Sequence, residues 1–130
     1  IGKGITIKEG AKIAILSIGS IISNALKAIE RLANKEQIGL YDMQFAKPLD
    51  KALLESIFST YETVITLEDG VIAGGFGSAI LQYASEQGFK NKVVTLGVSD
   101  SFMEHGTVAE LQELAGISSE RIKMTIQNYL

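Results

Sequence analysis

The sequence contains no cysteine and no tryptophan, and it has only one proline and one histidine. Without cysteine, the chain can form no disulfide and offers no thiolate as a nucleophile or metal ligand. The single histidine, His105, excludes a metal site built from several histidines of this chain. We therefore expect the fold to be stabilised by its apolar core alone.

The chain also lacks a marked excess of either charge and lacks a long apolar run. It has 12 basic and 15 acidic residues, with a net charge of -3 and no block of like charge. Nucleic-acid backbones are bound by clustered basic faces, so we expect no nucleic-acid partner. The longest uncharged stretches, residues 13–26 and 70–85, are shorter than the ~20 apolar residues of a membrane span. We expect a cytoplasmic protein without a membrane partner.

The apolar residues that are present suffice for one core. With 130 residues, of which 46% are hydrophobic and 21% charged, the chain has the size and composition of a single globular domain. We predict one domain over residues 1–130, and a chain of this length can fold without disulfides or metal. Because the sequence begins at Ile1 without an initiator methionine, we expect the domain to be a fragment of a larger chain.

Four short runs are apolar at consecutive positions, a pattern typical of strands that are covered on both faces. They lie at residues 13–18, 38–43, 64–67 and 93–98. A further short strand is predicted at residues 5–7. Glu9 and Gly10 follow it before the next apolar run begins, which predicts two antiparallel strands joined by a short turn.

Between the runs, apolar residues recur at intervals of three and four, as on one face of a helix. This periodicity predicts helices over residues 22–33, from Pro48 to about residue 59, and over residues 76–83. Asp50 lies in the predicted first turn after Pro48, where an acidic side chain complements the helix dipole. Two more helix starts are predicted by Ser118 as an N-cap and by the capping-box spacing of Thr107 and Glu110.

Strands that alternate with helices predict an α/β fold. We expect a three-layer α/β/α domain with a mostly parallel five-stranded sheet that contains one antiparallel strand. The helices are expected to cover both faces of the sheet.

Glycines gather after the predicted strand that ends near Leu67, at positions 70, 74, 75 and 77. They precede a helix, where backbone amides and the helix dipole can bind an anion. The spacing does not match a dinucleotide-binding motif, because Ile80 stands where its third glycine is needed, and no lysine follows Gly75 as in a phosphate-binding P-loop. Two interpretations remain: the glycines bind an anion, or they permit a tight turn and close helix packing.

Glu68 and Asp69 stand at the carboxyl end of a predicted strand, where open parallel sheets have their ligand crevices. Neighbouring strand residues point to opposite faces, so the two carboxylates do not plainly converge for acid–base chemistry, and one can instead cap the following turn. His105 follows the next predicted strand and can lie at the same edge. The candidate site-edge or interface residues are Glu68, Gly74, Gly75, Gly77 and His105.

Several motifs follow one another in a specific order along the whole chain. The longest is YDMQFAKPLD at residues 41–50, and the others are IGKG at 1–4, EG at 9–10, AIL at 14–16 with Gly19, TLEDG at 66–70, GGFGSA at 74–79, FMEHG at 102–106 and LAGI at 114–117. In this order they resemble the C-terminal domain of the 1-deoxy-D-xylulose-5-phosphate synthases, within the transketolase C-terminal domain family. The chain departs from that pattern at Gln44 and Ser101, where arginine is common, and at Ser99, where proline is common.

The resemblance implies a larger enzyme that condenses pyruvate, after decarboxylation, with glyceraldehyde 3-phosphate. Its products are 1-deoxyxylulose 5-phosphate and CO2, which implies a role in isoprenoid and thiamine biosynthesis. In that family thiamine diphosphate, Mg²⁺ and the substrates are bound by the first two domains. The third domain packs on them and supports the homodimer. The resemblance thus implies no catalytic, cofactor-binding or metal residue in this chain, which we expect to be inactive on its own.

Other interpretations stay open at this point. The same kind of terminal domain occurs in transketolase and in the beta subunit of 2-oxo acid dehydrogenases. Alternatively, the chain is a stand-alone module that binds an anion at residues 74–78 or that docks a separate protein.

Overall fold

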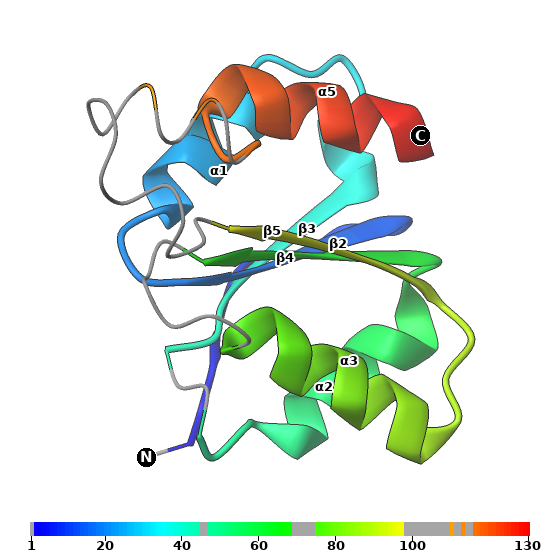
Figure 1. Ribbon diagram of the computed structural model, residues 1–130. Coiled ribbons are helices and arrows are strands. Elements are labelled where there is room, and N and C mark those ends of the chain that lie inside the picture. Colours follow the sequence, from blue (N-terminus) through cyan, green and yellow to red (C-terminus); the bar gives the residue numbers. More distant parts are fainter. Residues whose placement is uncertain (1, 45–46, 69–74, 98–109, 111–112, 114–115) are drawn as a thin grey trace.

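The computed structural model describes residues 2–44, 47–68, 75–97, 110, 113 and 116–130 (Figure 1). The described strands are β1 (Ile5–Lys8), β2 (Ile13–Ile18), β3 (Ile38–Asp42), β4 (Thr63–Glu68) and β5 (Lys92–Gly97). The α-helices described over their full length are α1 (Ile22–Glu30), α2 (Lys51–Thr60), α3 (Phe76–Gln87) and α5 (Ser119–Tyr129), and a 3-10 helix spans Lys35–Gln37. Glu110 and Glu113 also have helical backbone.

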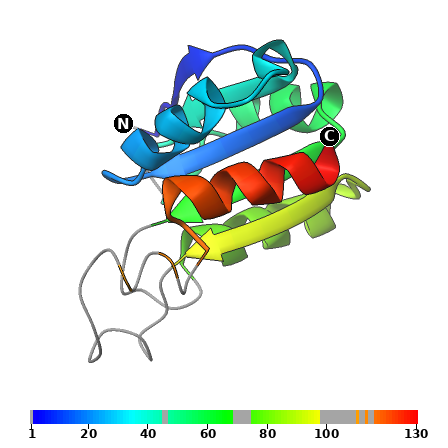
Figure 2. The same cartoon turned by 90° about the horizontal axis from the view of Figure 1, so that it is seen from above.

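The five strands form one sheet in the order β1-β3-β2-β4-β5. β2, β3, β4 and β5 are parallel to one another, and β1 pairs with β3 in the antiparallel direction. Figure 1 shows α1 and α5 on one face of the sheet and α2 and α3 on the other, and Figure 2 shows α1 and α5 lying over the strands. The predicted three-layer fold, with five strands of which one is antiparallel, is confirmed.

The core is divided into two parts by the sheet. Alternate residues of β2 reach opposite faces, so Ile13 and Ile15 pack with α1 and α5, while Ala14 and Leu16 pack with α2 and α3. Each of these four side chains is fully buried. β2 is apolar at consecutive positions because it is the central strand and has helices on both faces.

The predicted pairing of β1 with β2 is wrong, because β1 lies beside β3 instead. Both edges of β2 are occupied by β3 and β4, so the chain has to cross over the start of β3. Gly10 makes this crossing possible, since a Cβ at that position would come within 2.2 Å of the Ile38 carbonyl carbon. The Gly10 N–H donates to the Tyr61 hydroxyl at 2.9 Å, which fixes the crossing.

Three smaller predictions also differ from the structure. The helix predicted over residues 22–33 is shorter, because α1 ends at Glu30, and two apolar residues of the predicted range, Leu26 and Ala33, are exposed. Helix α2 begins at Lys51 rather than at Pro48, because the Asp50 side chain caps it. β5 was expected to be covered on both faces, but none of its residues is fully buried, because it is an edge strand with a neighbour on one side only.

Candidate functional site

The parallel strands all end at one edge of the sheet, and this edge contains the candidate residues that the structure describes. The connection from β2 to β3 passes through α1 on one face, whereas the connection from β3 to β4 passes through α2 on the other. Doubly wound sheets bind ligands at the place where the connecting helices change from one face of the sheet to the other. Glu68, Gly75 and Gly77 lie here, while Gly74 and His105 fall outside the described residues.

Glu68 is the last residue of β4, and its carboxylate binds the first turn of α3. The Gly77 N–H donates to Oε2 at 2.6 Å, and the Phe76 N–H donates to Oε1 at 3.3 Å. Amides at a helix N-terminus have no partner within the helix, and a negative charge there also complements the helix dipole. Glu68 therefore caps α3 from the neighbouring strand, although the N-cap position itself is glycine.

Two glycines make room for this carboxylate. A Cβ at Gly77 would lie 3.1 Å from Glu68 Oε2, 3.1 Å from Thr95 Cγ2 and 3.2 Å from Thr66 Oγ1. A Cβ at Gly97, which pairs with Glu68 across the sheet, would lie 2.8 Å from Glu68 Cγ. The structure thus shows close helix-to-strand packing at Gly77, as one of the two sequence interpretations supposed.

The same contacts limit what this helix start can do chemically. An external anion at the amides of Phe76 and Gly77 would have to displace the carboxylate that already accepts from both. Gly77 is buried, and Glu68 and Gly75 are partly buried. A ligand or interface contact at Glu68, Gly75 and Gly77 stays a prediction.

Asp50 is a second carboxylate that binds backbone amides. Its Oδ1 accepts from Leu53 N–H at 3.1 Å, and its Oδ2 accepts from Gly4 N–H at 2.9 Å. Burial on its own raises the pKa of Asp50, but the two hydrogen bonds and the nearby Lys3 outweigh it and leave the pKa below its ordinary value. The structural role expected of Asp50 is confirmed, although it is the N-cap of α2 and not a residue of its first turn.

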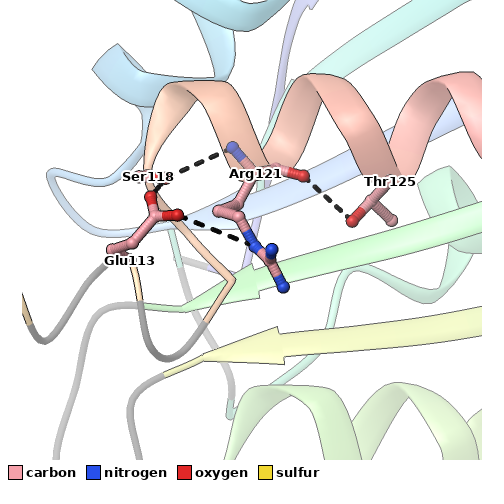
Figure 3. Close-up of polar contacts among 4 residues, drawn as sticks. All are labelled: Glu113, Ser118, Arg121 and Thr125. Atoms are coloured by element: carbon pink, nitrogen blue, oxygen red, sulfur yellow. Dashed lines mark hydrogen bonds and ion pairs between the residues drawn. The ribbon is translucent and has the colours of Figure 1, made fainter.

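Helix α5 is capped at Ser118, as the sequence predicted (Figure 3). The Ser118 Oγ accepts from Arg121 N–H at 3.2 Å and lies 2.5 Å from Glu113 Oε2, to which it donates. The Arg121 Nε lies 4.0 Å from Glu113 Oε1. These groups are exposed enough that the ion pair adds little to stability, and they satisfy one another rather than forming a free charged site.

Among the described residues, no group of three or more histidine, cysteine, aspartate or glutamate side chains could hold a metal ion. Within the same ranges, no helix is long and apolar enough to cross a membrane. Thr107, the first residue of the predicted capping box, lies outside the described residues.

Sequence reasoning missed three residues at this edge. Gly97 gave no signal, because its importance depends on the register that places it beside Glu68. Ser17 and Thr66 are fully buried on opposite faces, and neither hydroxyl has a hydrogen-bond partner among the described residues. A hydroxyl residue inside an otherwise apolar run was the available signal for both.

Comparison with known proteins places the chain in a family. The family model for the transketolase C-terminal domain matches residues 2–122. The chain is 45% identical to a 1-deoxy-D-xylulose-5-phosphate synthase of Parabacteroides distasonis over 94% of this chain and 20% of that protein. A protein of the same name from Vibrio vulnificus is 38% identical over 100% of this chain and 20% of its own length.

A solved structure agrees with these matches. A chain described as a split gene transketolase in an inactive beta4 tetramer superposes with a TM-score of 0.81 at 29% identity. The match covers 99% of this chain and 41% of that one. The chain spans about a fifth of the length of the curated relatives it matches. From the family match and the shared fold, the chain belongs to the transketolase C-terminal domain family.

Proposed function

We propose that this chain is the C-terminal, architectural domain of a 1-deoxy-D-xylulose-5-phosphate synthase. The observation that carries the proposal is the match over nearly the whole chain, at 38–45% identity, to relatives that bear this name and are about five times longer. The complete enzyme would join a two-carbon unit from pyruvate to glyceraldehyde 3-phosphate. It would be a cytoplasmic homodimer, and the other partners of this domain would be the remaining domains of its own chain.

The described residues do not fit a thiamine diphosphate and Mg²⁺ site. Magnesium is held by carboxylate oxygens and waters beside substrate phosphates, but no three histidine, cysteine, aspartate or glutamate side chains of the described residues come together to hold a metal ion. The oxygens of Glu68 and Asp50 also already accept from backbone amides. In the complete enzyme the cofactor supplies the carbanion chemistry. We place its site in the remaining four-fifths of the protein and assign no reaction step to this chain.

The outer edge of β1 supports a contact with those remaining domains. β1 is an edge strand, and its side chains Ile5 and Ile7 are 46% and 44% exposed. Apolar side chains on an open strand edge are usually covered, because such an edge can pair with other chains. The missing four-fifths of the protein is the occupant that we propose.

The activity of the longer protein that contains this chain tests the proposal directly. It should form 1-deoxyxylulose 5-phosphate from pyruvate and glyceraldehyde 3-phosphate, and the purified 130-residue chain should not. A protein that transfers two-carbon units between ketose and aldose phosphates, without using pyruvate, would contradict the assignment. That result would favour transketolase, the alternative that the 29% identical structural match supports.

The proposed contact has a matched test in the longer protein. Replacing Ile5 and Ile7 by threonine keeps a strand-forming side chain but removes apolar area, so synthase activity should fall. The control is Leu81→Gln on α3, because Leu81 is 45% exposed and lies on another element. Equal activity in the two variants would exclude β1 as the contact, while leaving the assigned reaction intact.

A further inference from the structure

The N-terminus of α1 differs from those of α2, α3 and α5. Asp50 caps α2, Glu68 binds the first amides of α3, and Ser118 caps α5. Helix α1 has Ile21 at its N-cap position and no side-chain cap, and no acidic residue lies in its first turn. Among the described residues, no group accepts from the N–H of Ile21 or Ile22.

A buried hydroxyl without a partner lies directly before this helix start. Ser17 is 0% exposed, and its Oγ has no hydrogen-bond partner in the part of the chain that the structure describes. Its side chain points to the α1 face, because Ser17 alternates along β2 with Ile13 and Ile15, which pack against Ile21 and Ala25. Leaving a buried hydroxyl unpaired destabilises a fold, so a missing partner at this position needs an explanation.

The turn between β2 and α1 is open to solvent. Gly19 has a φ of 89°, and no atom of the described residues lies within 4 Å of the position of a Cβ. Ser20, just before the N-cap, and Ser23, in the first turn, are exposed, and the Ser23 hydroxyl donates to the Ser20 carbonyl at 3.3 Å. The helix after β2 lies on one face of the sheet, and the helices after its neighbours β3 and β4 lie on the other. The start of α1 lies beside this change of face, where doubly wound sheets bind ligands.

Asp42 restricts the kind of ligand that fits. It ends β3 in register with Ser17, and its side chain shares the α1 face because it alternates with Ile38 and Leu40. One carboxylate oxygen accepts from Gln44 N–H at 3.2 Å, and no described group binds the other. A carboxylate there repels a bare phosphate but accepts from a sugar hydroxyl, as the acidic residue after the second strand does in ribose-binding α/β folds.

We propose that the start of α1 binds a phosphorylated sugar, with the phosphate on the amides of Ile21 and Ile22 and a hydroxyl on Asp42. The Ser17 hydroxyl donates to the phosphate from beneath, which supplies its missing partner. A pentose phosphate and a nucleotide share this chemistry. The site is separate from the helix start that Glu68 occupies, and it does not depend on the synthase assignment.

A nuclear magnetic resonance titration of the ¹⁵N-labelled chain tests the site, since both cores are made by residues of this chain. The probes are ribose 5-phosphate, adenosine 5'-monophosphate, inorganic phosphate and ribose, each to about 10 mM, which detects millimolar binding. The amides of Gly19, Ile21 and Ile22 should shift with both phosphorylated sugars, less with phosphate and not with ribose. Tighter binding of adenosine 5'-monophosphate than of ribose 5-phosphate would identify a nucleotide, and the reverse a sugar phosphate.

Matched variants separate the site from general effects on the fold. Ser17→Ala should raise the dissociation constant for ribose 5-phosphate about tenfold, the effect of losing one hydrogen bond to a charged group. Thr66→Val is the control, because it removes the other unpartnered buried hydroxyl, on the opposite face. Asp42→Asn should reduce the preference for ribose 5-phosphate over phosphate.

Two outcomes would overturn the proposal. One is the absence of shifts at Gly19, Ile21 and Ile22 with either phosphorylated sugar at the highest concentration. The other is an equal affinity of the Ser17→Ala and Thr66→Val variants, which would show that the Ser17 hydroxyl takes no part in binding.

Discussion

Helices α1 and α3 both begin at the carboxyl edge of the sheet, but their first amides have different partners. At α3 the partner comes from the protein itself, since Glu68 accepts from Phe76 and Gly77. At α1 no side chain of the described residues accepts from the first turn, and none of them pairs with the buried Ser17 hydroxyl. One helix start is closed by an internal carboxylate and the other is left for a solvent molecule or a ligand.

The difference shows how a glycine-rich helix start can be misleading in a sequence. The glycines at 75 and 77 suggested an anion site, but the space beside Gly77 contains the carboxylate of Glu68, from the strand that precedes the helix. The start of α1 has one glycine and a hydrophobic N-cap, so it carries no recognised motif. The presence of glycine therefore indicates close approach, and the approaching group can be internal.

Removing the internal carboxylate should have the largest effect on stability. Glu68→Ala leaves the amides of Phe76 and Gly77 without their charged acceptor, and we expect a loss of about 3 kcal/mol in the free energy of unfolding. Urea unfolding measures the change. Ser23→Ala, on the first turn of α1, is the control and should change it by less than about 0.5 kcal/mol. Equal losses in the two variants would show that the two helix starts do not differ.

The carboxylate that caps α2 should produce a pH dependence. The pKa of Asp50 is lowered in the folded state, so its contribution is present above the unfolded pKa and is lost as pH falls through the folded one. Asp50→Asn should cost about 1.5 kcal/mol at neutral pH and flatten the loss of stability below about pH 4. Denaturant unfolding at several pH values checks both effects. Glu62→Gln, with a carboxylate that is 73% exposed, should leave the profile unchanged.

Features that depend on short stretches of sequence were predictable. The central strand β2, the helix α5 and its cap at Ser118 follow from local apolar patterns and from a hydroxyl at the right position. That one of the acidic residues Glu68 and Asp69 has a capping role was also among the options, and Glu68 at the end of β4 has it. These features need no knowledge of what lies beside them in the sheet.

Features that depend on the register of the sheet were not predictable in this way. Strand β1 looked like half of a hairpin, but its partner is decided by which edges of β2 remain free. Gly97 matters only because β5 pairs with β4 so that Gly97 faces Glu68. The unpaired hydroxyl of Ser17 likewise becomes visible only when the α1 face has been built around it.

Alanine substitutions at Gly77 and Gly19 should distinguish the cost of lacking space from the cost of an unfavourable backbone conformation. Gly77→Ala places a Cβ 3.1 Å from Glu68 Oε2 and should cost about 2 kcal/mol by crowding. Gly19→Ala has open space but a φ of 89° and should cost about 1 kcal/mol by strain. Asparagine, which tolerates positive φ, should recover most of the loss at position 19 and worsen it at position 77. Recovery at both positions in thermal unfolding would contradict the packing argument.

An added charge should have the smallest effect, and its sign should differ between the two helices. Ser20→Asp places a carboxylate before the uncapped α1, and we expect a gain of about 0.5 kcal/mol from the helix dipole. Ser78→Asp places one in the first turn of α3, where Glu68 already supplies a negative charge, so we expect no gain. The gain at Ser20 should shrink in high salt, because an exposed charge is screened. A gain at Ser78 as large as at Ser20 would mean that Glu68 leaves the dipole of α3 as open as that of α1.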